Sequence, residues 1–367
     1  MKVKRLIAEA RTLRALYYFN LVRFFGDVPL ILDLKTVEDS KGPRDSKELI
    51  YDQIIEDLTF AEEHLPLRSE YSASDEGRIN KGAAKILFGK VYLTKGDFQK
   101  AKDKLAEVVE HESEYGFGLH KDYHANWLRD TEAGIEAVLY IEYKEPPFQH
   151  NGEMALAGPK YSIPGSLGIS ALNEADIPTQ ELYDQFDNRD LRKKTNFKTE
   201  FAHLKTGEIL KSSIPLSGKF WVEGLETGDR CDVNMHIIRY ADAILMYAEA
   251  LNEVGESTKA LAMLNRIRER AFGDDSGNFK PMSKDEFRTA ILNERRLEFP
   301  HEGHRWFDLV RTGTFIQRMK EHSAYEAKVA EANKTEIAQN IKEHMILMPI
   351  PQSEIDLNPN LVQNAGY

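Results

Sequence analysis

The sequence contains a single cysteine, Cys231, among its 367 residues. This excludes a disulfide bond within the chain, and it excludes a zinc or iron–sulfur site built from several cysteines. No uncharged apolar run of eighteen or more residues occurs, so no segment is long enough to cross a bilayer as a helix. A free cysteine behaves as a small apolar side chain, and we therefore expect Cys231 to be buried or half-buried.

The chain also lacks an excess of positive charge. It has 49 Lys and Arg residues against 60 Asp and Glu residues, which gives a formal net charge of -11. Proteins that bind nucleic acids need a concentrated basic surface to displace counterions, so we expect no nucleic-acid partner. Hydrophobic residues make up 41% of the chain and charged residues 30%, a balance typical of a folded, soluble protein.

Motifs that mark common catalytic sites are missing as well. We find no Gly-x-Ser-x-Gly elbow, no phosphate-cradling loop and no paired cysteine and histidine nucleophile. His301 and His304 are three residues apart, whereas zinc-protease helices place two histidines four apart on one face. We interpret this segment as a hydrogen-bonded structural cluster. We therefore expect no catalytic residue, no metal, no cofactor and no enzymatic activity.

Three aspartates recur at steps of three residues in a segment that also contains two arginines. The residues are Asp184, Asp187 and Asp190, with Arg189 and Arg192. A calcium loop needs oxygen ligands at alternate positions and a glycine at its turn, and neither is present. A pair of carboxylates for hydrolysis is the other functional alternative. Charges at helical spacing more often form ion pairs within the helix and cap its ends, and this is our prediction.

Helical periodicity dominates both ends of the chain. In the opening segment one predicted stripe consists of Leu6, Ala10, Leu13, Tyr17, Leu21 and Phe24, which recur every three or four residues. Glycine and proline in the sequence FGDVP, residues 25–29, predict the end of this helix. We expect a second helix at about 46–64, capped by Ser46, and a further helix at 284–299 behind Ser283.

An internal repeat links two distant segments. KGAAKILFGKVYLTKGDFQKAKDKLAEVVE (81–110) and ADAILMYAEALNEVGESTKALAMLNRIRER (241–270) carry small and aromatic residues at matching offsets, as in tetratricopeptide units. Gly96 and Gly255 would form the turns within these two helix pairs. Weaker copies around Phe19 and Phe299 bring the expected number to about four pairs, which should stack into a scaffold because each buries a face of its neighbour.

The segment between the two repeats, about 111–236, has a different character. It is rich in glycine, proline, aromatic and polar residues, and only the alternating run 137–143 suggests a buried strand. We thus predict a mainly α fold, a tetratricopeptide-like scaffold with a large loop-rich insertion carrying little β structure. As one domain, 1–367, it would comprise helical repeats at 1–110 and 237–320, the insertion at 111–236, and a helix with an extended tail at 321–367.

Five segments together resemble the SusD/RagB family of Bacteroidetes nutrient-binding proteins. They are AEARTLRALYYFNLVRFFGDVPLI (8–31), PTQELYDQFDNRDLRKKTNF (178–197), IIRYADAILMYAEALNEVG (237–255), LNERRLEFPHEGHRWFDLVRTG (292–313) and LMPIPQSEIDLNPNLVQNAGY (347–367). The resemblance implies a lipoprotein on the extracellular face of the outer membrane, acting as a lid on a SusC-like TonB-dependent transporter. Family members begin with a signal peptide, a lipid-bearing cysteine and a further segment. Since none of these precedes Met1, we expect an N-terminally truncated chain that is soluble without its anchor.

Aromatic residues on loops are the best candidates for ligand binding. A flat ring can cover the C–H face of a sugar while neighbouring polar groups bond its hydroxyls. Tyr17, Tyr92 and Tyr247 lie on helical stripes, and we assign them to the core. The predicted ligand-binding residues are Trp127, Trp221, Tyr123, Asn126, Tyr143, Phe148, Tyr161 and Phe220, with Gln149, Asn151 and Lys219 as further polar companions. Trp127 and Trp221 are the strongest of these, and family resemblance assigns none of them.

The expected function is therefore capture of a starch-type or other polysaccharide-derived oligosaccharide at the cell surface, followed by delivery to a TonB-dependent transporter. Two alternatives stay open. One is a peptide-capturing lid like the RagB branch, for which peptides should co-purify with the protein and its transporter. The other is a tetratricopeptide scaffold that binds another protein on its concave face, which would have no use for the loop aromatics.

Overall fold

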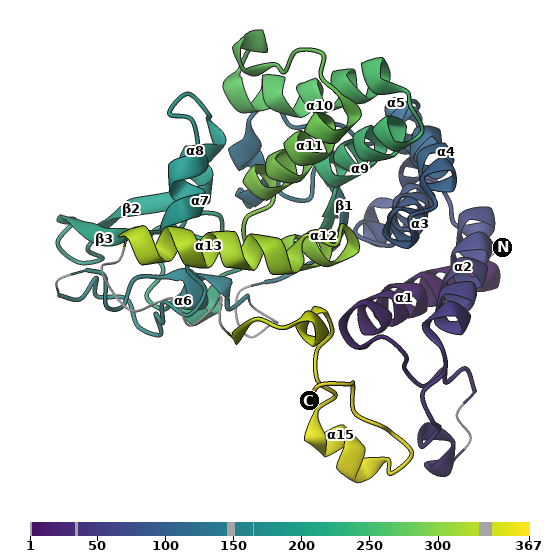
Figure 1. The fold of residues 1–367 in the computed structure, drawn as a ribbon. Coiled ribbons are helices and arrows are strands. Elements are labelled where there is room, and N and C mark those ends of the chain that lie inside the picture. The colour runs from purple at the N-terminus through teal and green to yellow at the C-terminus, as the bar shows by residue number, and fades with distance from the viewer. Residues whose placement is uncertain (1, 34–35, 145–150, 164, 330–339) are drawn as a thin grey trace. The chain divides into compact units, whose positions relative to one another are not determined.

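The computed structural model describes residues 2–33, 36–144, 151–163, 165–329 and 340–367 (Figure 1). It divides into two compact units. Unit 1 comprises Met1–Ser74, Arg78–Lys95 and Trp306–Tyr367, and unit 2 comprises Asp75–Gly77 and Gly96–Arg305. The whole of the predicted insertion therefore belongs to unit 2.

The N-terminal part of unit 1 is a layer of three helices. Helix α1 (Lys2–Phe25) packs against α2 (Lys47–His64), and α2 packs against α3 (Lys81–Lys95) (Figure 1). Gly26 ends α1 in the left-handed conformation, with φ +73°, which only glycine adopts without strain. The Ser46 hydroxyl accepts a hydrogen bond from the Leu49 amide and caps α2. Both predicted helices are thus confirmed.

Helix α1 does not bury the face that its periodicity predicted. Its buried residues include Ala15, Phe19 and Val22, whereas Tyr17 is 63% exposed on the opposite side. The prediction that Tyr17 belongs to the core is wrong, while Tyr92 and Tyr247 are buried as expected. Because α1 is apolar on two faces, periodicity alone could not decide which of them packs against α2.

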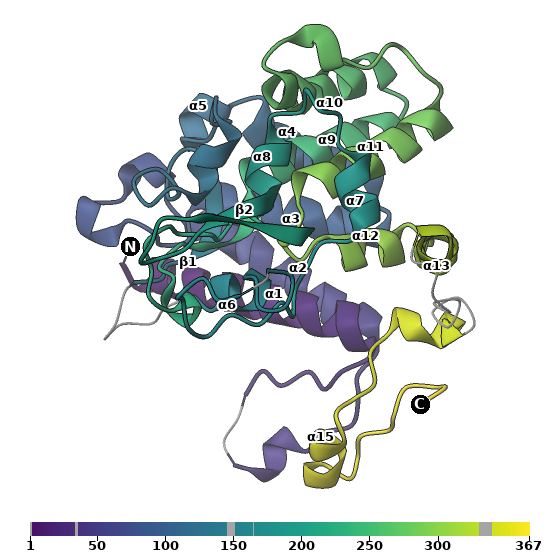
Figure 2. The ribbon, with the colours of Figure 1, turned by 90° about the vertical axis from the view of Figure 1, so that its left-hand side faces the viewer.

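The C-terminal part of unit 1 contains α12 (Arg305–Arg311), which begins at the last residue of unit 2, α13 (Phe315–Val329) and α15 (Gln352–Leu357). The tail is therefore only partly extended. The tail lies beside the segment that follows α1 (Figure 2), and side-chain hydrogen bonds join the two segments. Arg44 donates to the carbonyl oxygens of Phe25 at 3.0 Å and Val362 at 2.9 Å, and the Asn358 amide donates to the carbonyl oxygen of Gly42 at 2.9 Å.

The helices of unit 2 surround α9 (Tyr240–Glu253), which is buried along almost its whole length. It packs against α4 (Phe98–Val109), α10 (Ser257–Phe272) and α11 (Lys284–Glu298) (Figure 1). Gly255 forms the turn between α9 and α10 with φ +89°, as the repeat predicts. Ser283 and Glu286 form a capping box at the start of α11, which confirms that helix.

The insertion carries short helices and three of the four described strands, and the fourth strand begins at its end. The helices are α5 (Glu112–Tyr115), α6 (Glu153–Ala157), α7 (Gln180–Gln185) and α8 (Arg192–Asn196), and the strands are β1 (Ala137–Ile141), β2 (Phe197–Ala202), β3 (Ile209–Ser217) and β4 (Met235–Arg239). Strand β1 pairs antiparallel with β4, and β2 pairs antiparallel with β3. The mainly α fold with little β structure is confirmed, as is the strand near 137–143. The β2–β3 pair lies where the sequence indicated only loops.

Candidate functional site

The insertion has a hydrophobic core of its own. Its buried members are Tyr123, Trp127, Met154, Phe220, Cys231 and Val233. Cys231 is fully buried, which confirms the expectation for the lone cysteine. Burial raises the pKa of its thiol to about 11, so it carries little thiolate at neutral pH and is a packing residue.

Four of the predicted ligand-binding residues are buried inside this core or next to it. Trp127 is 4% exposed, Tyr123 and Phe220 are 3% exposed, and Asn126 is fully buried. The Tyr123 hydroxyl donates to the carbonyl oxygen of Glu298 at 2.6 Å, so its polar end is also used internally. These side chains present no ring face to solvent, and direct contact with a ligand does not fit their positions. The predicted loop aromatics pack inward because a loop-rich segment needs a core to be ordered.

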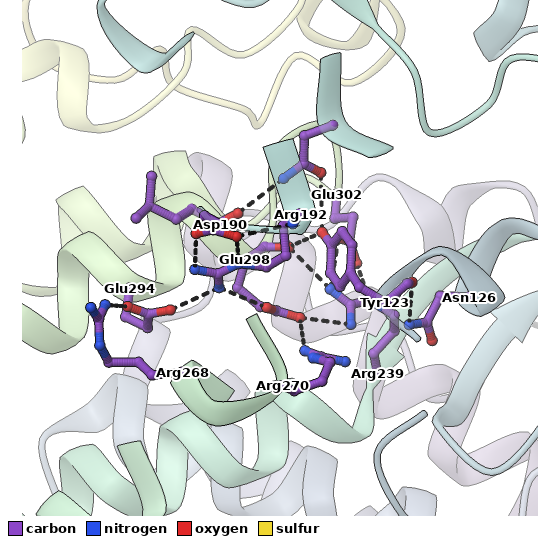
Figure 3. A network of polar contacts seen from close by, with 12 residues as sticks. Tyr123, Asn126, Asp190, Arg192, Arg239, Arg268, Arg270, Glu294, Glu298 and Glu302 are labelled. Atoms are coloured by element: carbon purple, nitrogen blue, oxygen red, sulfur yellow. Dashed lines mark hydrogen bonds and ion pairs between the residues drawn. The ribbon is translucent and has the colours of Figure 1, made fainter. Parts of the chain in front are cut away.

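Next to Tyr123 lies a buried network of ion pairs (Figure 3). At its centre is Glu298 on α11, whose two carboxylate oxygens contact three arginines. Oε1 lies 3.0 Å from Arg239 and 2.6 Å from Arg270, and Oε2 lies 3.0 Å from Arg192. Burial alone would raise the pKa of Glu298, but the three guanidinium groups hold it at about 2. This carboxylate therefore stays ionised.

The network extends on one side towards the insertion core. Arg239, at the end of β4, lies 2.7 Å from Glu302, and the Lys219 ammonium lies 2.6 Å from the same carboxylate. The Lys219 nitrogen also lies 4.6 Å from the centre of the Trp127 ring, a cation–π distance. Burial lowers the pKa of Lys219 to about 8, with Glu302 acting in the opposite direction. The tryptophan thus covers a charged cluster, which explains its burial.

On its other side the network reaches the segment that follows α7. Arg192 lies 2.7 Å from Asp190 and 2.7 Å from Glu294, and Arg268 lies 2.6 Å from Glu294. The prediction of ion pairs within a helix is wrong for Asp190, because it lies outside a helix and pairs with Arg192 only two positions away. Glu136 lies 2.9 Å from Arg270. The cations Arg192, Arg239, Arg268, Arg270 and Lys219 face the anions Glu136, Asp190, Glu294, Glu298 and Glu302, so the charges balance.

This arrangement favours a structural role for the network. Its members come from the insertion, from β4, from α10 and α11, and from the turn after α11, so the ion pairs connect the insertion to the helices of unit 2. Breaking one such pair would leave an unneutralised charge in the interior, which is costly. Among the described residues, no group of three or more His, Cys, Asp and Glu side chains is placed to hold a metal ion.

The two histidines near this turn each lie close to a carboxylate. His301 Nδ1 lies 3.0 Å from Asp176, and His304 Nδ1 lies 3.7 Å from Asp242. Both partners are single carboxylates, and Glu302 between the two histidines is occupied by Arg239 and Lys219. The interpretation of this segment as a structural cluster agrees with these contacts.

Tyr161 is the predicted aromatic residue that the structure places fully at the surface, with 75% of its area exposed. Its loop is held by Glu174, a residue that the sequence gave no reason to select. Glu174 Oε1 accepts hydrogen bonds from the amides of Lys160, Tyr161 and Ser162, at 2.5 to 2.8 Å, and from the Ser162 hydroxyl at 2.7 Å. These bonds lower the pKa of Glu174 although burial opposes them. The ring of Tyr161 is therefore displayed on an ordered loop.

The remaining predicted residues that the structure describes are partly or fully buried. Trp221 is partly buried, and its ring lies 4.7 Å from that of Phe201, edge to face. Tyr143 is half-buried, and its amide donates to the Asn234 side chain at 2.8 Å. Asn151 and Lys219 are buried. Phe148 and Gln149 lie outside the described residues.

Comparison with known proteins finds consistent similarity along the whole chain. Residues 212–367 match the model of the SusD family, and residues 1–93 match a family described as starch-binding and associating with the outer membrane. SusD-like protein P2 of Formosa agariphila is 30% identical to this chain, over all of the chain and 75% of the relative. The starch-binding protein SusD of Bacteroides thetaiotaomicron is 31% identical, over 98% of the chain and 72% of the relative. The chain belongs to the SusD family.

Solved structures of this family share the fold. A SusD superfamily protein from Parabacteroides distasonis superposes with a TM-score of 0.82 at 28% identity, over the whole chain and 79% of that structure. A structure described as a laminarin-binding SusD-like protein gives a TM-score of 0.77 at 28% identity, with the same coverage. The predicted family is therefore confirmed by sequence and by fold.

In this SusD family member, three of the five segments that carried the resemblance meet in the buried ion network. Asp190 and Arg192 come from 178–197, Arg239 from 237–255, and Glu298 and Glu302 from 292–313. The charged motifs by which the family is recognised thus act here as cross-links in the interior of unit 2. Within the described part of the chain, no helix combines the length and the low polarity needed to cross a membrane.

Proposed function

We propose that this chain is a glycan-binding protein that captures an oligosaccharide at the surface of its insertion and delivers it to a TonB-dependent transporter of the outer membrane. The support for a glycan comes from the description of the family that matches residues 1–93, and from relatives named for binding starch and laminarin. The insertion supplies a rigid support for surface loops, since the ion network and the aromatic core fix it to the helices of unit 2. Binding without catalysis is the activity that we infer.

One observation carries the location of the site: the exposed ring of Tyr161 on its clamped loop. A sugar offers a flat face of C–H groups, and an exposed aromatic ring can cover that face. Because Glu174 fixes three successive amides of the loop, little conformational freedom is lost when a ligand binds. The carbonyl oxygen of Ser162 also accepts a hydrogen bond from the Ser213 amide at 2.9 Å, which fastens the loop to β3.

The neighbourhood of Tyr161 provides polar partners for the hydroxyl groups of a sugar. The Lys160 ammonium lies 5.1 Å from the centre of the Tyr161 ring, and its three N–H groups can donate to hydroxyl oxygens. Trp221 and Tyr143 keep part of their surface exposed and stay secondary candidates. We expect weak affinity, because a site on the surface buries only part of its ligand.

Calorimetric titration against a panel of oligosaccharides, including fragments of starch and laminarin, tests this proposal. We expect Tyr161→Ala to weaken the binding of the responding glycan at least tenfold, equivalent to about 1.4 kcal/mol. Tyr161→Phe keeps the ring and should stay within about twofold of the unaltered protein. Tyr17→Ala removes another exposed tyrosine, 63% accessible and in unit 1, and should leave glycan binding unchanged.

Two results would contradict the proposal. If no glycan of the panel bound, the proposed glycan-binding function would be wrong. If Tyr161→Ala bound a glycan as tightly as the unaltered protein, only the proposed position of the site would be wrong. Delivery to a transporter is tested separately, by isolating the protein from the cells that make it. A TonB-dependent outer-membrane transporter should be retained with it through gentle detergent extraction, and its absence would argue against that step.

A further inference from the structure

Left-handed backbone at residues other than glycine is concentrated in one part of unit 2. In the described part of the chain, three such residues have a positive φ: Ala171 at +59°, Glu174 at +49° and His301 at +60°. An L-residue is strained in this conformation and keeps it only where surrounding contacts hold it. Ala171 and Glu174 lie in one loop, and the imidazole of His301 contacts Asp176 at the end of that loop. Strain that gathers around one loop indicates that its position has a function.

The strained loop, residues 171–176, is bound to helix α6 through its backbone. The amides of Asn173, Glu174 and Ala175 donate to carbonyl oxygens within residues 155–158, at 2.7 to 3.1 Å. The Glu174 carboxylate in turn accepts the hydrogen bonds of three successive amides around Tyr161. The strained loop is therefore the support on which the exposed ring of Tyr161 depends.

His301 joins this loop to the turn that follows α11. Its Nδ1 lies 3.0 Å from Asp176 Oδ2, and Nδ1 must carry the proton of this hydrogen bond, because an ionised carboxylate only accepts. The side chain of His301 is 6% exposed and that of Asp176 is 51% exposed, so the buried partner fixes the exposed one. The hydrogen bond lowers the pKa of Asp176, although burial opposes it, and the carboxylate stays ionised at neutral pH.

The turn that carries His301 is itself fixed on both sides. The next residue, Glu302, belongs to the buried ion network through Arg239 and Lys219. Pro300, directly before His301, restricts the backbone on the other side. A continuous series of contacts therefore runs from the ion network through His301 to the strained loop.

We propose that His301 is a positioning residue for the ring of Tyr161. Acting through Asp176, it holds the strained loop whose Glu174 binds the Tyr161 amide. The role of this ring in glycan binding is that of the proposed function, on which the inference rests. Strained residues relax when an anchor is lost, so the loop depends on His301 more than an unstrained loop would. The side chain of His301 is almost fully buried and acts without touching the ligand.

Three substitutions at His301 separate its hydrogen bond from the shape of its turn. His301→Ala removes the donor. His301→Asn keeps an N–H donor, and asparagine adopts a positive φ more readily than most residues, so it should restore the contact. His301→Gly suits the backbone conformation but has no donor, and it should behave like His301→Ala.

Limited proteolysis with trypsin measures the position of the loop without any glycan. Trypsin cleaves after lysine, and Lys160, directly before Tyr161, is exposed. Because cleavage requires local opening of the chain, it should be about tenfold faster after Lys160 in His301→Ala and His301→Gly than in the unaltered protein. His301→Asn should stay within about twofold of the unaltered protein.

Cleavage after Lys205, which is exposed in the turn between β2 and β3, is the internal control and should not change. Mass spectrometry of the fragments distinguishes the two cleavage sites. Unchanged cleavage after Lys160 in His301→Ala would overturn the inference. Faster cleavage at both sites would also overturn it, since the substitution would then loosen the insertion as a whole.

Affinity for the responding glycan is the second measurement. We expect His301→Ala to weaken binding about fivefold, because the ring of Tyr161 is then no longer held in place for the ligand. In a Tyr161→Ala background the same substitution should have no further effect, which a purely structural role would not produce. Equal effects with and without the ring would overturn the inference. If no glycan binds the unaltered protein, the proposed function is wrong, and proteolysis alone decides whether His301 positions the loop.

Discussion

The two units place charged and apolar side chains in opposite ways. In unit 2, Arg192, Arg239 and Glu298 are fully buried, although all three side chains are charged. In unit 1, Leu13 and Tyr17 lie on the surface, although they belong to a regular apolar stripe. The burial of charge is possible because each ion meets an opposite charge at hydrogen-bonding distance. Leu13 and Tyr17 are exposed because they lie on the side of α1 away from the buried Phe19.

The largest effect is expected from removing one charge of the buried network. Arg239→Met leaves Glu136, Glu298 and Glu302 without their shared cation, and we expect a loss of about 4 kcal/mol in the free energy of unfolding. Lys211→Met breaks the exposed pair with Glu200, with 77% and 55% of the side chains exposed, and should cost less than about 1 kcal/mol. Denaturant unfolding followed by circular dichroism measures both. Equal losses would abolish the distinction between buried and exposed charge.

The next effect separates packing from ligand binding among the tryptophans. Trp127→Ala removes a buried ring from the insertion core and should lower the free energy of unfolding by about 3 kcal/mol. Trp221→Ala should lower the free energy of unfolding by less, because Trp221 is only partly buried. If Trp127→Ala instead left the thermal unfolding temperature unchanged and reduced glycan affinity, Trp127 would have to be exposed to the ligand in the glycan-bound protein.

A pH dependence tests the unusual position of Lys219. Its pKa falls from 10.5 in the unfolded chain to about 8 in the folded protein, so between these values the unfolded state binds more protons. Stability contributed by this group must therefore rise as the pH increases from 8 to 10.5. Relative to Lys219→Met, the unaltered protein should gain about 2 kcal/mol over this interval. If the free energy of unfolding changed equally with pH in both proteins, the pKa of Lys219 would not be lowered in the folded state.

The smallest effect is expected on the exposed side of α1, where Tyr17 lies. Tyr17→Ser removes an exposed ring from the 367-residue chain, and its free energy of unfolding should change by less than about 0.5 kcal/mol. Phe19→Ala, on the buried face two residues away, should cost about 3 kcal/mol and is the control. A large loss of unfolding free energy in Tyr17→Ser would mean that this side of α1 packs within the chain. Unit 1 would then not differ from unit 2 by exposing apolar side chains.

Much of the scaffold could be predicted because its signals are local. Ser46 and Ser283 cap their helices, and Gly26, Gly96 and Gly255 adopt the left-handed conformation at the predicted turns. Such choices depend on the backbone of a few neighbouring residues, which the sequence specifies directly. The family could be identified for the same reason, since its motifs are contiguous in the chain.

The candidate site could be predicted only in part. A tyrosine on a glycine- and proline-rich segment is the same sequence signal for Tyr161, at the surface, and for Tyr123, in the interior. The residues that distinguish them lie elsewhere in the chain. Glu174 accepts a hydrogen bond from the Tyr161 amide, whereas the carbonyl oxygen of Glu298 accepts one from the Tyr123 hydroxyl. Composition cannot reveal such pairings, because they depend on how the insertion closes over the helices.

The sequence by itself determined the helices, their caps and turns, the repeat and the family, since these follow from contacts between near neighbours. Only the tertiary structure decided which residues meet across the chain. It brought Arg192, Arg239 and Glu298 together in one buried network, turned Trp127 inward and left Tyr161 outside. The physical reason is that the burial of a side chain is fixed by the surface that covers it, and that surface comes from segments far away in the sequence.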